Sequence, residues 1–556
     1  MSAKPGVDSG AVARLVEAAA RGEPRPLAGL VERLAAAGLV VEVRRAGRVV
    51  GRDGVAGVLV SGLADDSRAV RAGSLFAAVP GFHLDGHDFV PRAAAAGAAA
   101  ALVERAVPDA GLVQVVVTAA RPALAQAAGW WAGDPSRDLG VVGVTGTDGK
   151  TTTSFLAVAA LEAAGISTGL VGTVETKVGD LRERHEVHVT TPGAPELQAT
   201  LAAMRTAGNA AVVLETTSHA LELDRVAGIA YDAAIFTNLT HEHLDLHGTF
   251  ERYRAAKLRL FAALAAGPGN PVKAVAGRAW PRTAVINRDD PAAPAFEAAA
   301  RAAGAAVIGY GTTEAAAVHA GDVRATGVDE DAHRLRIRFD GPGGPGELAL
   351  RLAGRFNVHN ALAVVALGAG LGLDGAAVIA GLEGVRGVPG RMERIDVGQP
   401  FGVIVDYAHS PASLRVVLDL LAPVAAAQGG GLIAVFGSGG ERDVAKRAAM
   451  GRIAGERCRL VVATDEDPRG EDRHAIIEEI VRGAEAAGRR RGEDVLAVAD
   501  RREAIAVAVA RARPGDLVLL AGKGHEPTIL YADGAIPWDE AAVARETLAA
   551  QGFGGR

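Results

Sequence analysis

The sequence predicts an α/β protein of several domains, and three observations support this prediction. Residues 139–144 form an apolar run of the kind found in buried parallel strands, and a glycine-rich turn and a helical segment follow directly. Beyond residue 388, short apolar runs again alternate with helical segments, and polar residues follow each run. The length of 556 residues corresponds to roughly three to four domains.

The glycine-rich turn, GVTGTDGKTT at 143–152, has the features of a phosphate-binding loop. Its glycines let backbone N–H groups face an anion, the helix N-terminus adds a partial positive charge, and Lys150 adds a full one. Thr151 occupies the position that binds Mg²⁺ in such loops. Val144 stands where the common pattern has glycine, so the loop is a variant. An ordinary turn with an incidental lysine is the simpler alternative, which the flanking strand and helix disfavour.

Composition excludes several classes of function. The formal net charge of −6 gives no support to a nucleic-acid or anionic-membrane partner. Cys458 is the only cysteine, so no intrachain disulfide can form, which fits a reducing compartment. The N-terminus lacks a signal-peptide pattern, and no apolar run is long enough to span a membrane. We therefore expect a soluble, cytoplasmic protein.

The N-terminal region combines a helical pattern at 27–37 with short strand-like runs at 40–43 and 55–60. Residues 1 to about 20 look like a loosely held extension, to which we assign no role. A strand is expected at 74–79, after a polar loop that holds Ser67 and Arg68. An arginine fork suits phosphate oxygens, but Asp-Ser-Arg is also an ordinary turn sequence, and both interpretations stay open.

Downstream of the phosphate loop, a polar hairpin is expected at 175–189 and a helix at 194–207. The strand at 210–214 ends in Glu215, an arrangement that places a carboxylate on Mg²⁺. Another strand, at 233–237, precedes three alternating histidines, His241, His243 and His247. The histidines suggest zinc, but no cysteine lies nearby and the phosphate loop already implies Mg²⁺.

Lys257 lies in a helical segment expected at 250–264, and composition alone makes it a solvated lysine. A further strand, at 283–286, ends in Asn287. Residues 318–352 are expected to form antiparallel strands, because apolar and polar residues alternate on either side of a Gly/Pro turn. An alanine-rich helix follows.

The last region, beyond a boundary near residue 388, again contains apolar strands that end in polar residues. Apolar strands are expected at 402–405, 432–436, 460–463 and 517–520. Each is followed directly by polar and charged residues. The carboxyl ends of parallel strands form the ligand-binding edge of an open sheet, so we expect a second site there.

Taken together, these motifs resemble the Mur ligase family, and within it the MurE type, from about Asp65 to the C-terminus. The motifs that carry the resemblance occur in order along the chain: the loop at 143–152, Thr190-Thr191-Pro192, Glu215, Ser218-His219-Ala220-Leu221, Thr237-Asn238-Leu239, His243-Leu244-Asp245, Ala256-Lys257, Gly354-Arg355-Phe356-Asn357, Gly390-Arg391-Met392-Glu393, Asp406-Tyr407-Ala408-His409, Arg442-Asp443, Lys446-Arg447 and Gly522-Lys523-Gly524-His525-Glu526.

The resemblance implies three domains. Residues 1–138 would bind UDP-MurNAc-dipeptide and include the N-terminal extension. Residues 139–388 would form a central ATPase domain around a P-loop-type parallel sheet. Residues 389–556 would form a Rossmann-like α/β domain that binds the amino acid. In this family, ATP phosphorylates the free carboxylate of UDP-MurNAc-L-Ala-D-Glu, and an amine attacks the acyl phosphate during peptidoglycan precursor synthesis. The protein would act as a monomer on small-molecule substrates.

The resemblance also assigns residues to ATP and metal. Positions that match ATP contacts are Gly146, Thr147, Asp148, Gly149, Lys150, Thr151, Thr152, Asn287, Arg391 and Asp406. Positions that match catalytic or Mg²⁺-binding residues are Lys150, Thr151, Glu215, His243 and Lys257. Lys257 matches a lysine that this family carbamylates to N6-carboxylysine, and an anionic carbamate can hold a second Mg²⁺. The resemblance thus overturns the solvated interpretation of this lysine.

Two further sets of residues match substrate contacts. The UDP-substrate set is Ser67, Thr190, Thr191, Thr217 and Arg225. The amino-acid set is Arg442, Glu466, Asp467, Pro468, Arg469, Gly522 and Glu526.

Four positions depart from the family pattern. Enzymes of this type that use meso-diaminopimelate carry Asp-Asn-Pro-Arg, where this chain has Glu466-Asp467-Pro468-Arg469. Asp467 loses an amide donor and adds negative charge, which favours a dibasic side chain such as lysine. Because the arginines are retained, we expect meso-diaminopimelate, with L-lysine or another amino acid as the alternative. Leu223 replaces a glutamine and Asp148 replaces an asparagine.

Other functions remain as alternatives. One alternative is another Mur ligase or a folylpolyglutamate synthase. The runs at 406–409 and 522–526 favour the MurE type, but the altered Glu466-Asp467 leaves room for a relative with a different amino acceptor. An inactive nucleotide-binding scaffold subunit would be expected to lose Lys150, Glu215, His243 or Lys257, and all four are present.

Overall fold

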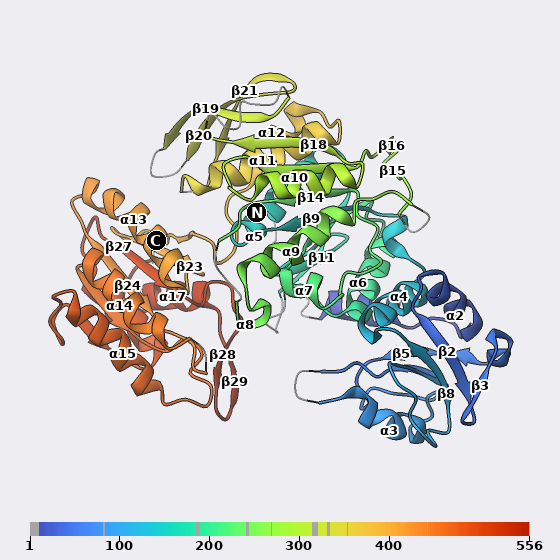
Figure 1. Cartoon of the computed structure of the whole chain (residues 1–556). Helices are drawn as coiled ribbons and strands as arrows, with labels where there is room; N and C mark the ends of the chain where they lie inside the picture. The colour runs from blue at the N-terminus through green and yellow to red at the C-terminus, as the bar shows by residue number, and fades with distance from the viewer. Residues whose placement is uncertain are drawn as a thin grey trace.

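The computed structural model describes residues 10–81, 84–184, 190–240, 244–267, 270–313, 321–330, 334–352, 354–441 and 443–554. Over these residues the chain forms three α/β units, each built around its own large sheet (Figure 1). The predicted class, α/β with several parallel-containing sheets in three domains, is confirmed. The boundaries at 138/139 and 388/389 stay a prediction.

The central sheet contains eleven strands among the described residues, in the order β12-β11-β10-β13-β9-β14-β17-β18-β19-β20-β21. Strands β10 to β19 in this order run parallel, and antiparallel hairpins extend both edges, as the polar and alternating segments predicted. The strands are β9 (Gly140–Thr145), β10 (Thr168–Val171), β11 (Glu175–Val178), β12 (Leu181–Arg184), β13 (Ala211–Glu215), β14 (Ala233–Phe236), β17 (Thr283–Asn287), β18 (Ala306–Gly311), β19 (Val323–Glu330), β20 (Leu335–Gly341) and β21 (Gly344–Leu350).

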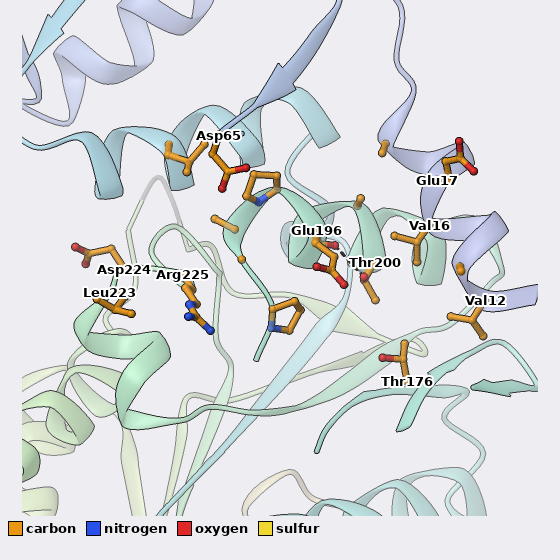
Figure 2. Close-up of a pocket in the computed structure, with 18 of the residues that line it drawn as sticks. Val12, Val16, Glu17, Asp65, Thr176, Glu196, Thr200, Leu223, Asp224 and Arg225 are labelled. Atoms are coloured by element: carbon orange, nitrogen blue, oxygen red, sulfur yellow. Dashed lines mark hydrogen bonds between the residues drawn. The ribbon is translucent and has the colours of Figure 1, made fainter. Parts of the chain in front are cut away.

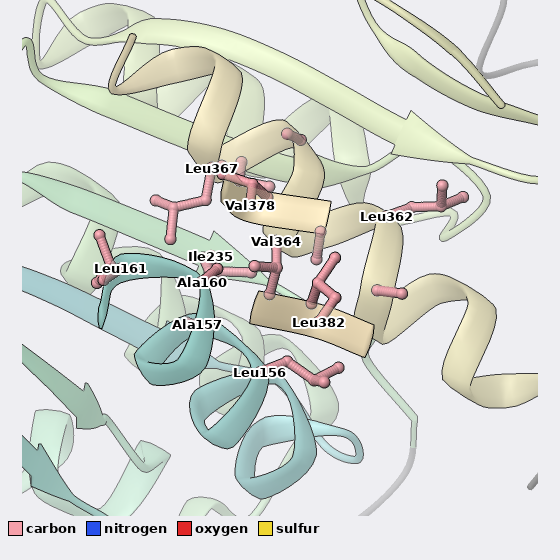
Figure 3. Packing of buried hydrophobic residues seen from close by; sticks show 14 of the residues in the cluster. Leu156, Ala157, Ala160, Leu161, Ile235, Leu362, Val364, Leu367, Val378 and Leu382 are labelled. Atoms are coloured by element: carbon pink, nitrogen blue, oxygen red, sulfur yellow. The ribbon is translucent and has the colours of Figure 1, made fainter. Parts of the chain in front are cut away.

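Helices cover both faces of this sheet because its middle strands are buried throughout. One face packs against α5 (Lys150–Ala163), α11 (Phe356–Gly370) and α12 (Gly375–Gly384), as Figure 3 shows. The other face packs against α6 (Ala194–Thr206), α7 (Ser218–Glu222), α9 (Phe250–Ala262) and α10 (Ala293–Ala302). A short helix, α8 (Leu244–His247), precedes α9, and a small hairpin pairs β15 (Ala274–Val275) with β16 (Arg278–Ala279).

The N-terminal unit has the strand order β3-β2-β8-β7-β6-β5. Its elements are α2 (Leu27–Ala36), β2 (Val40–Arg45), β3 (Arg48–Val50), β5 (Gly62–Ala64), β6 (Ser74–Ala77), α3 (Val90–Ala95), β7 (Ala100–Val103), β8 (Val113–Val117) and α4 (Ala120–Ala132). The strand predicted at 55–60 is shorter than expected. A 3₁₀ turn covers Arg52–Val55, and only β4 (Leu59–Val60) is extended, paired with β1 (Arg25–Pro26).

Helix α1 (Ala11–Ala20) differs from the loosely held extension expected at the N-terminus. It packs against α6 and β12 of the central unit. Val12 is 4% exposed and belongs to the apolar cluster under α6, with Val16 and Ala19 packed against the same cluster. The extension is therefore a structural element of the central unit.

The C-terminal unit has the strand order β22-β23-β27-β24-β25-β26, parallel from β23 onward. Its elements are β22 (Glu393–Ile395), β23 (Gly402–Asp406), α13 (Pro411–Ala427), β24 (Leu432–Phe436), α14 (Ala445–Arg457), β25 (Leu460–Ala463), α15 (Arg473–Ala486), β26 (Val495–Ala497), α16 (Arg501–Arg511), β27 (Leu517–Ala521), β28 (Thr528–Tyr531), β29 (Gly534–Pro537) and α17 (Glu540–Ala550). The strands predicted here are all present.

Separate apolar clusters cover the two faces of the C-terminal sheet. Helices α13, α14 and α15 pack on one face, and α16 and α17 pack on the other. Cys458 lies fully buried in the first cluster, where burial raises the pKa of its thiol to about 12. Across the described parts of all three units, no helix is both long and apolar enough to cross a membrane.

Candidate functional site

The phosphate loop connects β9 to α5, as predicted. Lys150 Nζ donates to the carbonyl oxygens of Gly146, at 3.0 Å, and Thr147, at 2.6 Å. Gly146 has a φ of 153°, and a Cβ there would lie 1.8 Å from Thr237 Oγ1 at the end of β14. Only glycine therefore fits this position of the loop.

The end of β14 holds the loop in place, through residues that carried no assigned role. Thr237 Oγ1 donates to the Asp148 carbonyl at 2.6 Å, and the Asp148 N–H donates to Asn238 Oδ1 at 2.9 Å. The Thr147 N–H donates to the Asn238 carbonyl at 2.8 Å. These bonds fix the loop backbone, so it needs little rearrangement to receive an anion.

Glu215 lies at the carboxyl end of β13, beside the loop, and its exposed fraction is 0%. Thr151 Oγ1 donates to Glu215 Oε2 at 3.1 Å. Thr173, which follows β10, donates its N–H to Glu215 Oε1 at 2.9 Å and its hydroxyl to Oε2 at 2.8 Å. Sequence reasoning missed Thr173, although its position at the carboxyl end of a parallel strand was a usable signal.

Lys257 is buried, in contrast to the solvated lysine that composition predicts. Its exposed fraction is 1%, and its Nζ donates to the Gly146 carbonyl at 2.7 Å. The Nζ also lies 4.6 Å from the centre of the Tyr253 ring. The Tyr253 hydroxyl in turn lies 3.0 Å from Thr147 Oγ1. Helix α9 therefore brings Lys257 to the phosphate loop, where the resemblance places it.

These residues suit Mg²⁺ chemically. The Thr151 hydroxyl and the Glu215 carboxylate are hard oxygen ligands that lie side by side at the loop. His243 and Arg442 fall outside the described residues, as does His241. Among the residues that the structure describes, no group of three or more His, Cys, Asp or Glu side chains is placed to hold a metal.

The predicted UDP-substrate threonines adjoin Glu215. The Thr190 and Thr173 hydroxyl oxygens lie 3.1 Å apart, and Thr191 Oγ1 donates to the Glu215 carbonyl at 2.7 Å. Thr191 Oγ1 also lies 3.3 Å from Thr217 Oγ1, the N-cap of α7. The Arg225 guanidinium donates to the Thr191 carbonyl at 2.9 Å. One hydrogen-bonded network thus extends from the phosphate loop to these residues.

A groove of about 850 Å³ opens beside Arg225 (Figure 2). Residues of the N-terminal unit, among them Asp65 and Arg121, line one side, and the start of α6 and residues 223–225 line the central-unit side. The groove continues over the first turns of α6 to helix α1. Ser67 lies in the loop after β5, close in sequence to Asp65. Arg68 forms an exposed ion pair with Asp66 at 2.6 Å, which favours the plain-turn interpretation for this arginine.

The remaining predicted nucleotide residues lie at strand ends. Asn287 ends β17, and its Nδ2 donates to the Thr237 carbonyl at 2.6 Å. Asp406 ends β23 and accepts from the N–H groups of Met392 and Ala408, both at 2.8 Å. Burial raises the pKa of Asp406, and nearby Arg391 partly offsets this effect. The Arg391 guanidinium lies 4.5 Å from the Tyr407 ring centre.

The predicted amino-acid residues form a second network, and Lys523 lies at its centre. Lys523 Nζ is fully buried and contacts Asp467 Oδ1 at 2.7 Å and Glu526 Oε2 at 2.5 Å. The Tyr407 hydroxyl donates to Glu526 Oε1 at 3.0 Å. Burial and the neighbouring Glu526 carboxylate raise the pKa of Tyr407 well above its usual range. Lys523 and Tyr407 belong to motifs quoted from the sequence, but neither was assigned a role.

Glu466 and Arg469 each have one buried polar atom without a hydrogen-bond partner among the described residues. Glu466 is 8% exposed, and its Oε2 has no hydrogen-bond partner among the described residues. A Cβ at Gly522 would lie 3.0 Å from that oxygen. The Nε of Arg469 is likewise buried without a partner in the described part of the chain, and its φ is 55°. After Pro468, this left-handed turn of the backbone bends the chain toward β28, where the Arg469 N–H donates to the Leu530 carbonyl at 2.9 Å.

Comparison with protein-family models assigns most of the chain. Residues 59–129 match "Mur ligase family, catalytic domain", residues 144–368 match "Mur ligase middle domain", and residues 390–524 match "Mur ligase, glutamate ligase domain".

The chain is similar to curated proteins over nearly its whole length. It is 50% identical over 501 residues to a UDP-N-acetylmuramyl-tripeptide synthetase of Roseiflexus sp. (strain RS-1), covering 89% of this chain and 96% of that protein. It is 43% identical to a protein of the same name in Deinococcus radiodurans, covering 88% and 95%. It is 42% identical to a UDP-N-acetylmuramoyl-L-alanyl-D-glutamate–2,6-diaminopimelate ligase of Streptomyces coelicolor, covering 88% and 92%.

Solved structures agree in fold. A UDP-N-acetylmuramoyl-L-alanyl-D-glutamate–2,6-diaminopimelate ligase superposes with a TM-score of 0.61 at 29% identity, covering 89% of this chain and 95% of that one. MurF from Acinetobacter baumannii shares the fold, with a TM-score of 0.57 at 20% identity and coverage of 95% and 98%.

Proposed function

This chain belongs to the Mur ligase family, and we propose that it is the ligase that adds the third amino acid to UDP-MurNAc-L-Ala-D-Glu. The observation that carries this proposal is the network around Glu215. It joins Thr151 of the phosphate loop to Thr173 and Thr190, so ATP and the nucleotide substrate would meet at one carboxylate.

The reaction consists of two transfers. The D-Glu carboxylate attacks the γ-phosphorus of ATP and releases ADP, and the amine of the amino acid then attacks the acyl phosphate and releases phosphate. Lys150 would move from the loop carbonyls to the β- and γ-phosphates, and the loop amides would orient them. Arg391 would neutralise charge on the γ-phosphate, Asn287 would contact adenine, and Asp406 would accept from the ribose.

Thr151 and Glu215 would hold Mg²⁺, with His243 and carbamylated Lys257 at a second metal position. When bound, the metal neutralises charge on the phosphates as the phosphoryl group transfers. Burial of Lys257 at the loop supports this assignment, because a carbamate there would face the phosphates. Ser67, Thr190, Thr191, Thr217 and Arg225 would contact the nucleotide substrate.

For the amino acid we propose meso-2,6-diaminopimelate. Asp467 is paired with buried Lys523, which largely compensates its negative charge. Arg469 keeps a free Nε within the described residues, and an arginine fork suits the distal carboxylate. Arg442, Gly522 and Glu526 would complete the pocket.

L-Lysine is the second candidate, because the pocket contains the carboxylates of Glu466, Asp467 and Glu526. Glu466 presents a buried carboxylate oxygen that has no partner among the described residues. A side-chain ammonium would satisfy this oxygen, and such an ammonium is present in both amino acids. Lysine would need no partner for a distal carboxylate, so a pocket rich in carboxylates accepts it more readily.

The test is an assay of the purified protein with ATP, Mg²⁺, UDP-MurNAc-L-Ala-D-Glu and one amino acid at a time. We expect ADP release and a tripeptide nucleotide of the mass of the diaminopimelate adduct. An Asp467→Asn variant, assayed in parallel, should keep the same amino-acid preference, because Lys523 already compensates the charge of Asp467. Preference for L-lysine would overturn the amino-acid assignment, and absence of product with every amino acid would overturn the ligase proposal.

A further inference from the structure

Helix α1 is attached at its N-terminal end to the central unit. Gly10, at its N-cap, offers no side chain to the first turn. Glu183 of β12 takes that place, because its Oε2 accepts from the N–H groups of Val12 at 2.8 Å and Ala13 at 3.2 Å. A carboxylate at this end also stabilises the helix dipole.

The C-terminal end of α1 is attached to the N-terminal unit. Trp131 of α4 donates its indole N–H to the Ala20 carbonyl, the last residue of α1, at 2.8 Å. A Cβ at Gly22 would lie 3.1 Å from the same indole ring, so the chain passes directly over it as it leaves the helix. One short helix is therefore bonded at its two ends to two different units.

The side of α1 between these anchors faces the groove (Figure 2). Val12, Ala13, Val16, Glu17 and Ala20 line the same groove as Arg225 and Asp65. Val12 and Val16 also pack on the apolar cluster under α6, which leaves the helix little freedom to rotate.

We propose that α1 is a positioning element for the nucleotide substrate. It braces the N-terminal unit, which carries Ser67, against the central unit, which carries Thr191 and Arg225, and it closes one end of the groove between them. This inference rests on the proposed function, since a substrate that contacts both units is bound best when their spacing is fixed before binding.

The test weakens each anchor separately in the full chain. Trp131→Phe removes the indole donor and keeps an aromatic ring, and Glu183→Ala removes the acceptor at the helix N-terminus. Each loses one or two hydrogen bonds, so we expect KM for UDP-MurNAc-L-Ala-D-Glu to rise about three- to tenfold. Because the nucleotide residues and the phosphate loop are untouched, KM for ATP and kcat should stay unchanged.

Matched control variants distinguish loss of the α1 anchors from a general loss of stability. Leu15→Gln changes an exposed residue of α1, and Leu181→Gln changes an exposed residue of β12; neither residue lines the groove. Both should leave KM unchanged. Hydrogen–deuterium exchange of the α1 amides should accelerate in Trp131→Phe and Glu183→Ala only.

A chain without residues 1–21 removes the helix outright, and its thermal unfolding shows whether it folds. If this chain or the two anchor variants bind the nucleotide as the parent does, the inference is overturned. Calorimetric titration with UDP-MurNAc-L-Ala-D-Glu measures that binding without catalysis. The outcome is therefore distinct from failure of the proposed function, which would appear as an inactive parent protein.

Discussion

Two lysines donate to one carbonyl oxygen, that of Gly146, at the start of the phosphate loop. Lys150 approaches it at 3.0 Å and Lys257 at 2.7 Å. Two ammonium groups at one acceptor repel each other, and the repulsion is strong where water is excluded. Conversion of Lys257 to a carbamate would replace this repulsion with attraction.

Lys257→Ala should therefore nearly abolish turnover, by about a hundredfold or more in kcat. Acetate or another small acid in the buffer should restore part of the activity, because a free carboxylate can enter the space left by the side chain. Steady-state rates with and without acetate measure this effect. Near-normal activity of the variant would show that the carbamate assignment is wrong.

Arg469→Ala should act on the amino acid and not on ATP. Its guanidinium has an unpartnered Nε in the described structure, and loss of a charge-assisted bond costs about 2 kcal/mol, or roughly thirtyfold in KM for the amino acid. KM for ATP should change by less than about twofold. Equal effects on both constants would place Arg469 outside the amino-acid pocket.

Asp406 makes stability depend on pH in a defined direction. Burial raises its pKa above the ordinary 3.8, so the folded protein binds this proton more tightly than the unfolded chain does. The stability that the bound proton contributes is therefore lost as the pH rises from 3.8, the pKa in the unfolded chain, through the raised pKa of the folded protein. In Asp406→Asn this contribution is absent, so its Tm should fall less than that of the parent as the pH rises above the ordinary carboxyl pKa of 3.8. Thermal unfolding across this range measures the difference, and parallel curves would contradict it.

At this scale the sequence predicted the positions of candidate site residues better than it predicted their surroundings. Glu215 and Lys150 were predicted from their positions after strands, and the structure confirms those positions. Lys257 is buried and bonds to the Gly146 carbonyl, 111 positions away in the sequence, so local composition gave no sign of this contact. Lys523 was missed as the partner of Asp467 for the same reason.

Among the elements, α5 carries the phosphate loop and its packing is tight. A Cβ at Gly381 of α12 would lie 2.5 Å from the Ala159 carbonyl oxygen and 2.7 Å from Ala160 Cα, both in α5. Figure 3 shows the apolar side chains around this crossing, among them Leu156, Val378 and Leu382. Backbone cannot yield as a flexible side chain does, so the two helices would have to separate.

Gly381→Ala should destabilise the protein by about 1–3 kcal/mol and raise KM for ATP, because α5 would shift with its loop. Gly384→Ala, in the last position of α12, is the matched control, since no atom lies within 4 Å of its added Cβ. Thermal unfolding and ATP titration of both variants make the comparison. Equal behaviour of the two variants would contradict the role given to this contact.

Most elements were predictable because an apolar run of four to six residues is sufficient to identify a buried strand. Helix α1 was not. Its sequence is alanine-rich and lacks a side-chain cap, and the cap comes from Glu183, 171 positions later. The strand expected at 55–60 is reduced to Leu59–Val60, because Gly54 and Gly57 favour a turn before it.

At the scale of the whole molecule, the C-terminal unit has its own hydrophobic core, so we expect it to fold alone. The apolar clusters on both faces of its sheet contain only residues beyond 391. A fragment of residues 390–554 should therefore unfold cooperatively, with the circular dichroism of an α/β protein.

A shorter fragment, 390–538, provides the control, because it lacks α17 and with it Ala541, Val543, Ala544 and Leu548 of one cluster. It should be much less stable or fail to fold. Cooperative unfolding of the short fragment, or its absence in the long one, would show that the unit depends on the rest of the chain.

The general plan of the molecule could be predicted, but not how its units join. Parallel strands with polar ends indicated separate α/β units, and family models fall on residues 59–129, 144–368 and 390–524. The joints include contacts between residues that are distant in the sequence, such as Trp131 with Ala20 and Arg184 with Asp539. No periodicity in the sequence encodes such contacts.

The buried thiol of Cys458 has a practical consequence. With its pKa at about 12 and no second cysteine in the chain, the native protein offers maleimide reagents nothing to react with at neutral pH. Any cysteine introduced on the surface would then carry a fluorophore or spin label alone. Pairs of such labels, one on each unit, could follow the distances between units during turnover without prior removal of a native thiol.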